Sequence, residues 1–198
     1  MLKILRPASP HNFAANTYVI RSDDEIAVID PTVPYDRNRY GENVKYIILT
    51  HAHFDHMLEI DSWKQSGAEV VVSIYDKCGL SDSFRNCYRI FCGSDMGYFG
   101  EARSVKDGEV IALGSDTLTV MECPGHTAGS MSLIGEKIAF VGDTIFEGGG
   151  YGRCDLPSGD YSLLKKSIER LCALPPDTTI YSGHGKPFTV EEYKKHLI

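Results

Sequence analysis

The segment LTHAHFDHM, residues 49–57, limits what this chain can fold into more than any other part of the sequence. It places His51, His53, Asp55 and His56 within six positions, directly after the apolar run YIIL. That run predicts a short buried strand, and if the extended backbone continues, the first two histidines point to the same side because side chains alternate along a strand. The next two donors then lie where the chain turns into a predicted helix, DHMLEIDSWKQSG. We interpret the cluster as a metal site at the carboxyl end of a strand rather than as a polar loop with incidental histidines.

The composition is that of an ordinary globular protein. The 198 residues predict a single domain, 1–198, and apolar residues make up 42% and charged residues 24%. A formal net charge of −7 disfavours a surface for nucleic acid or for anionic membranes, because both attract clustered Lys and Arg. No segment is apolar for long enough to predict a membrane span, and the first residues are too briefly apolar for a secretory signal. We interpret the six cysteines, which include no Cys-x-x-Cys pair, as reduced thiols of a cytoplasmic protein.

The order of predicted elements favours an α/β fold. Strands, a helix, strands and a helix follow one another, and the pattern restarts midway along the chain. Two stacked sheets with helices on their outer faces would satisfy this order. Residues 75–108 are irregular and predict one or two short helices and a loop that could overhang a site. The predicted strands cover residues 3–6, 16–22, 25–30, 45–49, 68–74, 108–113, 116–125, 130–135 and 137–143, with a strand and loop at 177–185. The predicted helices cover residues 55–67, 158–174 and 189–198.

Three further metal-capable residues follow predicted strands in the second half. His126 lies in CPGHTAGS, Asp143 in VGDT and His184 in SGHGK, and each has a neighbouring glycine that permits a tight turn. Together with the first cluster they make five histidines and two aspartates. This number suits two divalent metals better than one, because a catalytic site uses about three protein ligands per metal and leaves a position for water.

At this point the sequence resembles the metallo-β-lactamase superfamily, in which THAHFDH, PGHTAGS, GDTIF and SGHG occur in this order. The segment FEGGGYGRCDLPSGD further resembles the glyoxalase II-like (hydroxyacylglutathione hydrolase-like) and persulfide dioxygenase-like branches, although the sequence shows no counterpart of the C-terminal helical domain of glyoxalase II. The resemblance implies a four-layer αββα sandwich with the metals at one edge between the sheets. It implies that His51, His53 and His126 hold the first metal, that Asp55, His56 and His184 hold the second, and that Asp143 bridges both. Asp30 matches an aspartate that would orient a ligand imidazole, the alternative being an aspartate that starts a turn before Pro31.

Two such metals, together with the resemblance of the segment after Asp143, favour hydrolysis of a thioester of a glutathione-like small thiol. They would lower the pKa of a shared water, which Asp55 or Asp143 could orient for attack on the carbonyl carbon, and a thiolate leaves without much help from an acid. Zinc is favoured, although iron and manganese accept the same ligands. Candidate contacts to the small-molecule substrate are Arg153, Lys186 and Tyr151, with a surface salt bridge as the alternative for the two basic residues. Nothing in the sequence predicts the oligomeric state.

Two other activities remain open. A mononuclear iron persulfide dioxygenase would use His51, His53 and His126 or their near equivalents with Asp143, and the GRCD segment favours it. A non-hydrolytic diiron redox module is less favoured, because such sites usually carry a glutamate where this chain has His53. A nuclease is disfavoured by the acidic charge and the length, and a β-lactamase by the absence of an export signal.

Overall fold

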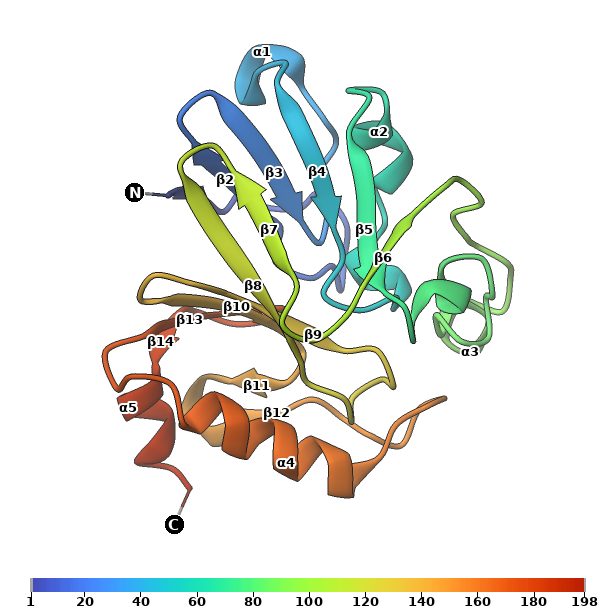
Figure 1. The fold of residues 1–198 in the computed structure, drawn as a ribbon. Helices are drawn as coiled ribbons and strands as arrows, with labels where there is room; N and C mark the ends of the chain where they lie inside the picture. The colour runs from blue at the N-terminus through green and yellow to red at the C-terminus, as the bar shows by residue number, and fades with distance from the viewer. Residues whose placement is uncertain (1, 198) are drawn as a thin grey trace.

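The structure is a computed structural model that describes residues 2–197, and these residues form two six-stranded sheets and one two-stranded sheet (Figure 1). In the first sheet β1, β2 and β3 pair antiparallel, whereas β3, β4, β5 and β6 run parallel. In the second sheet, of order β14-β13-β10-β9-β8-β7, only the β10–β13 pair is parallel. The strands of the first sheet are β1 Lys3–Leu5, β2 Tyr18–Ser22, β3 Glu25–Ile29, β4 Val44–Ile48, β5 Glu69–Ser73 and β6 Arg103–Val105. Those of the second are β7 Val110–Leu113, β8 Asp116–Glu122, β9 Met131–Gly135, β10 Ile138–Gly142, β13 Thr179–Ser182 and β14 Phe188–Thr189, and β11 Ile145–Phe146 pairs with β12 Gly150–Tyr151.

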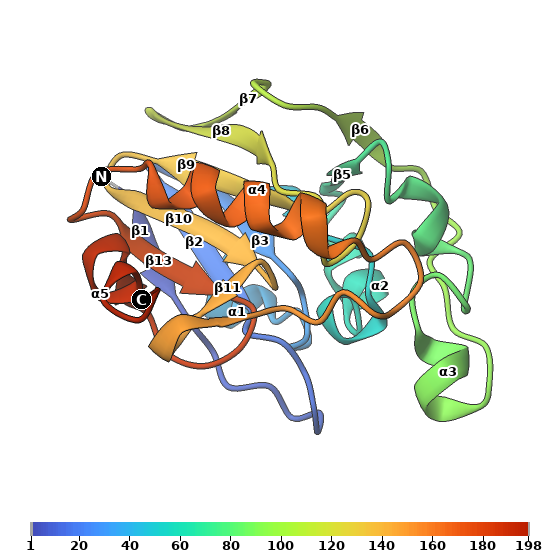
Figure 2. The same cartoon turned by 90° about the horizontal axis from the view of Figure 1, so that it is seen from below.

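The helices cover the outer faces of the two sheets. In Figures 1 and 2, α4 and α5 lie on one side of the molecule and α1 and α2 on the other. The described helices are α1 Arg37–Tyr40, α2 Ile60–Lys64, α3 Tyr88–Cys92, α4 Tyr161–Cys172 and α5 Val190–Lys194. The short 3₁₀ turns are η1 Phe54–His56, η2 Lys77–Leu80 and η3 Glu147–Gly149.

Three apolar clusters within residues 2–197 account for these layers. One packs Trp63 of α2 against the outer face of the first sheet, and another packs Leu171 of α4 against the outer face of the second. The third lies between the sheets. β4 contributes to two of them, because Ile47 faces the helices and Ile48 faces the opposite sheet, as expected for a central strand buried on both faces. The predicted αββα sandwich is therefore confirmed.

Helix α4 lies within the predicted segment 158–174 and begins directly after Asp160. The Asp160 side chain caps it by accepting a hydrogen bond from the Leu163 amide, and Leu164 and Leu171 are fully buried. Removing a leucine side chain of this size from water stabilises the fold by roughly 1.5–3 kcal/mol. The end of the last predicted helix, residue 198, lies outside the described residues.

The predicted helix over residues 55–67 is wrong in extent. The chain first forms the 3₁₀ turn η1, with hydrogen bonds from the His56 amide to the His53 carbonyl and from the Met57 amide to the Phe54 carbonyl. These i→i+3 bonds wind the backbone more tightly than an α-helix. The Glu59 amide then bonds to Pro31 in another part of the chain, and α2 begins only at Ile60. Tertiary contacts thus replace the first turns of the expected helix.

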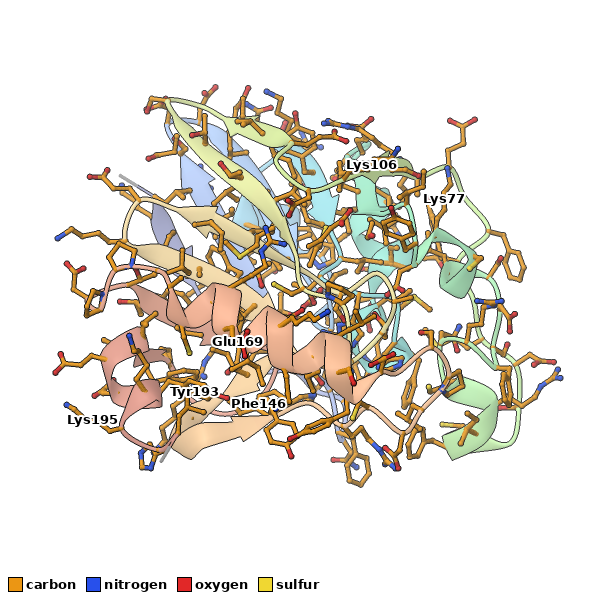
Figure 3. All side chains as sticks on the ribbon, turned by 60° about the horizontal axis from the view of Figure 1, so that its bottom comes forward. Lys77, Lys106, Phe146, Glu169, Tyr193 and Lys195 are labelled. Carbon is orange, nitrogen blue, oxygen red and sulfur yellow. The ribbon has the colours of Figure 1, made fainter. Side chains whose placement is uncertain are left out.

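Residues 75–108 contain η2, α3 and β6, so the expectation of one or two short helices is confirmed. Helix α3 projects from one edge of the molecule in all three views (Figures 1, 2 and 3). No helix between residues 2 and 197 is long and apolar enough to cross a membrane.

Candidate metal centre

The predicted donors come together where strands of both sheets end. His51, His53, Asp55 and His56 follow β4 of the first sheet, whereas the other three donors follow β8, β10 and β13 of the second. Gly142 makes the close approach of the sheets possible, because it has a φ of 51° and a Cβ atom there would lie 2.4 Å from the Thr50 hydroxyl.

Among the described residues, three groups each place their ligand atoms within 4.8 Å of one another. Asp143 lies between the groups, since its Oδ1 is 3.2 Å from His56 Nε2, whereas its Oδ2 is 3.5 Å from His184 Nε2 and 3.7 Å from His126 Nε2. One carboxylate thus reaches both halves of the donor set. The three groups are His51, His53 and His126; His51, His56 and Asp143; and Asp55, His56 and His184.

Asp30 fixes the orientation of two of the imidazoles. Its Oδ2 accepts hydrogen bonds from His56 Nδ1 at 2.9 Å and from the Thr50 hydroxyl at 2.7 Å, and its Oδ1 accepts from the Thr50 amide at 2.8 Å. Because the Thr50 hydroxyl donates to Asp30, it can accept from His51 Nδ1, which lies 3.2 Å away. When each ring is neutral and carries its proton on Nδ1, its Nε2 lone pair points toward the cluster. Asp30 is therefore in contact with a candidate ligand, as the orienting interpretation requires.

The remaining ligand atoms point into the same space. The Arg153 carbonyl accepts a hydrogen bond from His126 Nδ1 at 2.6 Å, which leaves Nε2 of that ring free. The contact between His56 Nε2 and Asp143 Oδ1 is electrostatic rather than an aligned hydrogen bond. Within residues 2–197, the buried ligand atoms without a hydrogen-bond partner are Nε2 of His51, His53, His56 and His126, and Oδ1 of Asp143.

Such a set of orphaned atoms fits a divalent metal. A buried polar atom without a partner costs about 1–3 kcal/mol, and coordination of a cation would remove that cost at each atom. Imidazole nitrogens and carboxylate oxygens are ligands that zinc, iron and manganese accept. The residues present therefore fit the metals that the sequence predicts.

Two histidines of the first group, His51 and His53, are held neutral, as metal ligands must be. Burial, together with the neighbouring imidazoles, lowers the pKa of His51 well below its ordinary value. Burial and the nearby His126 lower the pKa of His53 to about 3. Both rings therefore offer a lone pair rather than a proton at neutral pH.

In the second group, carboxylates and imidazoles shift one another's pKa values in opposite directions. Burial by itself would raise the pKa of Asp143, but the neighbouring imidazoles of His56, His126 and His184 together outweigh it and hold that pKa far below the usual range. Conversely, burial would lower the pKa of His56, but Asp143, Asp30 and Asp55 together raise it well above its ordinary value. A cluster that draws in a proton so strongly also favours a metal cation in the proton's place.

Comparison with known proteins decides the family. The family model described as the metallo-beta-lactamase superfamily matches residues 12–184, a segment that includes all seven donors. The chain belongs to the metallo-β-lactamase superfamily.

One curated protein and two solved structures illustrate what this chain is similar to. The hydroxyacylglutathione hydrolase GloC of Haemophilus influenzae is 34% identical over 194 residues, which cover 92% of this chain and 91% of that protein. Among solved structures, the BLEG-1 B3 metallo-beta-lactamase has a TM-score of 0.87 at 30% identity and covers 99% of this chain and 97% of its own. TTHA1623 in a di-iron-bound form has a TM-score of 0.83 at 25% identity, with 97% and 98% covered.

In this protein, a cavity of about 830 Å³ opens beside the seven candidate metal ligands. Five of the seven donors line it, and His51 and His56 lie behind them. Residues of α3 and its preceding turn line another side, so the expected overhanging segment is present. The five lining donors are His53, Asp55, His126, Asp143 and His184.

The three predicted substrate contacts occupy different positions. Arg153 lines the cavity, and its guanidinium forms two 2.7 Å hydrogen bonds with Asp155. Lys186 is exposed and Tyr151 packs 6.0 Å from the Tyr161 ring, and neither is among the described residues that line the cavity. Contact of these three side chains with a substrate stays a prediction.

Asp76 is a functional candidate that sequence reasoning missed. Its buried carboxylate accepts hydrogen bonds from the Ala52 amide at 3.0 Å, the Thr127 hydroxyl at 2.8 Å and the Gly129 amide at 2.8 Å. Ala52 separates two histidine ligands of the first sheet, whereas the other two partners follow His126 of the second sheet. Asp76 thereby ties together the two loops that supply the first metal group. Its place just after β5, the parallel neighbour of β4, is a sequence signal that could have indicated this edge.

Proposed function

We propose that this protein is a dinuclear metal-dependent hydrolase that acts on a thioester of a glutathione-like small thiol. The single observation that supports the dinuclear site most strongly is the position of Asp143, whose two oxygens face both donor groups. The name of the Haemophilus influenzae relative supports the thioester, and the di-iron form of TTHA1623 supports two metals. Zinc is the metal that we favour.

The metals, when bound, supply Lewis acidity that lowers the pKa of water and polarises a carbonyl group. The half-buried carboxylate of Asp55 and the carboxylate of Asp143 both line the cavity, where either can accept a hydrogen bond from the attacking water and so orient it, and the proton that the water gives up passes to the solvent. The water oxygen forms a bond to the carbonyl carbon, the carbon–sulfur bond breaks, and the sulfur leaves with its electron pair as a thiolate. Because a thiol has a pKa near 8.5, this leaving group needs little help from an acid.

The buried cysteine of the cavity does not offer an alternative nucleophile. Cys87 lines the cavity, but burial raises the pKa of its thiol to about 11. At neutral pH this side chain is a protonated thiol, and thiols react through the thiolate. Cys87 therefore has less support as a nucleophile than activated water.

We also propose a cytoplasmic location. None of the six cysteines, all of which lie within the described residues, forms a disulfide, and this pattern is typical of proteins in a reducing compartment.

The proposal is tested with zinc-loaded protein and S-lactoylglutathione, alongside lactone and phosphodiester substrates. We expect thioester hydrolysis, and we expect Asp143→Asn to lower kcat/KM by about a hundredfold or more. Asp177→Asn is the matched control, because Asp177 is exposed and pairs only with Lys137 among its described partners. Full metal loading without thioester hydrolysis would refute the proposal, and oxygen uptake with glutathione persulfide would indicate the dioxygenase instead.

A further inference from the structure

Three aromatic side chains form one side of the cavity. The Phe54 ring lies 5.3 Å from the Tyr88 ring at 78° and 6.2 Å from the Phe91 ring at 40°. We call these three residues the aromatic wall, and all three line the cavity. Phe54 stands between two predicted ligands, His53 and Asp55, so the wall begins next to the metal centre.

The wall is fixed in place by the segment that carries α3. The Phe54 amide donates a hydrogen bond to the Asn86 carbonyl at 2.9 Å, which joins the first ligand loop to the residues before α3. The Asn86 side chain donates to the Met96 carbonyl at 2.9 Å, and the Ser83 hydroxyl lies 3.1 Å from the same oxygen. These bonds close the loop around α3 and hold its aromatic residues against Phe54.

Apolar side chains continue around the rest of the cavity. Leu58 and Leu156 line it, and so does Phe146, which Figure 3 labels and whose ring lies 6.1 Å from that of His184. Phe13 lines it as well and is 90% exposed, so a large apolar surface faces the open side. Water leaves such a surface readily when an apolar ligand group covers it.

The basic groups of the cavity are already paired. Apart from the donors, the described residues that line it include two basic side chains, His11 and Arg153. His11 Nε2 lies 2.6 Å from a carboxylate oxygen of Glu59, and Arg153 binds both oxygens of Asp155. An anionic substrate group would have to compete with these carboxylates.

We propose that the substrate carries an aryl or branched-alkyl group next to its thioester, and that the aromatic wall selects it, with Phe91 as a specificity-determining residue. This inference rests on the proposed function, since it assumes that the scissile carbonyl lies at the donors beside Phe54. The apolar group belongs either to the acyl part or to the thiol part, and the substrates tested below separate the two.

Three small thioesters measure the preference in zinc-loaded protein. S-methyl thioacetate is the reference, S-methyl 2-phenylethanethioate places a phenyl group on the acyl side, and S-benzyl thioacetate places it on the thiol side. We expect one of the two aryl substrates to exceed the reference in kcat/KM by about tenfold or more, which is the discrimination that one or a few buried carbon atoms provide.

The test variant is Phe91→Ala and the matched control is Phe84→Ala. Both phenylalanines are 55% exposed and lie within the same segment, but Phe84 is not among the described residues that line the cavity. We expect Phe91→Ala to remove about tenfold from kcat/KM for the preferred aryl substrate and less than about twofold for the reference. Phe84→Ala is expected to leave both values unchanged.

A binding measurement without catalysis separates this inference from the proposed function. Ligand-observed NMR compares phenylacetamide with acetamide on metal-free protein, where neither probe is hydrolysed. We expect phenylacetamide to bind more tightly, and we expect Phe91→Ala but not Phe84→Ala to weaken it. Thioester inactivity combined with this binding pattern would refute the function and support the aromatic wall. Equal rates for all three thioesters, or equal effects of the two variants on aryl substrate and probe, would overturn the inference while the hydrolase proposal stands.

Discussion

Replacing Asp76 by asparagine tests how the two halves of the fold hold the first metal group. The substitution keeps the size of the side chain but leaves one acceptor oxygen in place of two. If the amide oxygen occupies the Oδ2 position, it keeps the bonds from Ala52 and Thr127, and the new NH₂ group then faces the Gly129 amide. That amide is buried and loses a bond to a charged acceptor.

The magnitude follows from that single lost bond. A hydrogen bond to a charged group is worth about 1.5–3 kcal/mol, and a buried donor left without an acceptor costs a similar amount. Burial raises the pKa of Asp76, so the neutral asparagine recovers part of this cost by avoiding a desolvated charge. We therefore expect the free energy of unfolding of the metal-free protein to fall by about 2 kcal/mol, as measured by urea denaturation.

Metal affinity is the second measurement on the same variant. Because Asp76 joins the loop of His51 and His53 to that of His126, we expect about tenfold to a hundredfold weaker zinc binding at that group in a chelator competition titration. Asp177→Asn, on the exposed surface, serves as the control. An Asp76→Asn protein with unchanged unfolding free energy and unchanged zinc affinity would refute the reasoning.

Two further predictions concern the other buried groups of the site. His53 has a pKa of about 3 in the metal-free fold, below the 6.5 of an unperturbed histidine. As the pH falls, the unfolded chain therefore binds the proton first, so stability that is present above about pH 6.5 is lost below it. Between about pH 7.5 and about pH 5, urea unfolding should show the wild type losing about 2 kcal/mol more than His53→Gln, and parallel curves would contradict the pKa assignment. Asp30→Asn weakens the acceptor for His56 Nδ1, so zinc binding at the second group should fall by about tenfold in a competition titration. An unchanged affinity would show that Asp30 serves only the backbone turn.

The seven donors were predictable because each follows a strand whose hydrophobic pattern is clear. Residues such as His126 and His184 sit next to glycines directly after strand ends, and strands that share a sheet bring their ends together. Local sequence therefore carried most of the information about which side chains converge. The αββα layering was expected from the order of strands and helices and from the family resemblance, and Ile47 and Ile48 illustrate it by facing opposite layers.

What local sequence did not contain were the contacts between distant segments. The helix expected from residue 55 is replaced by η1 because the Glu59 amide bonds to Pro31, a partner in another part of the chain. By sequence alone Asp76 is an ordinary loop residue. Its role becomes visible only in the fold, where the amides of Ala52 and Gly129 donate hydrogen bonds to its carboxylate. The aromatic wall could not be predicted from local sequence either, because the rings of Phe54 and Phe91 come together only when the segment of α3 packs against the first ligand loop.

The most direct test of the account is an anomalous difference map from crystals of the zinc-loaded protein. We expect two peaks roughly 3.5–4 Å apart. One should lie within coordination distance of His51, His53 and His126, the other near His56 and its partners, and Asp143 should reach both. A single peak, or zinc bound away from these side chains, would contradict the dinuclear centre on which the proposed hydrolysis depends.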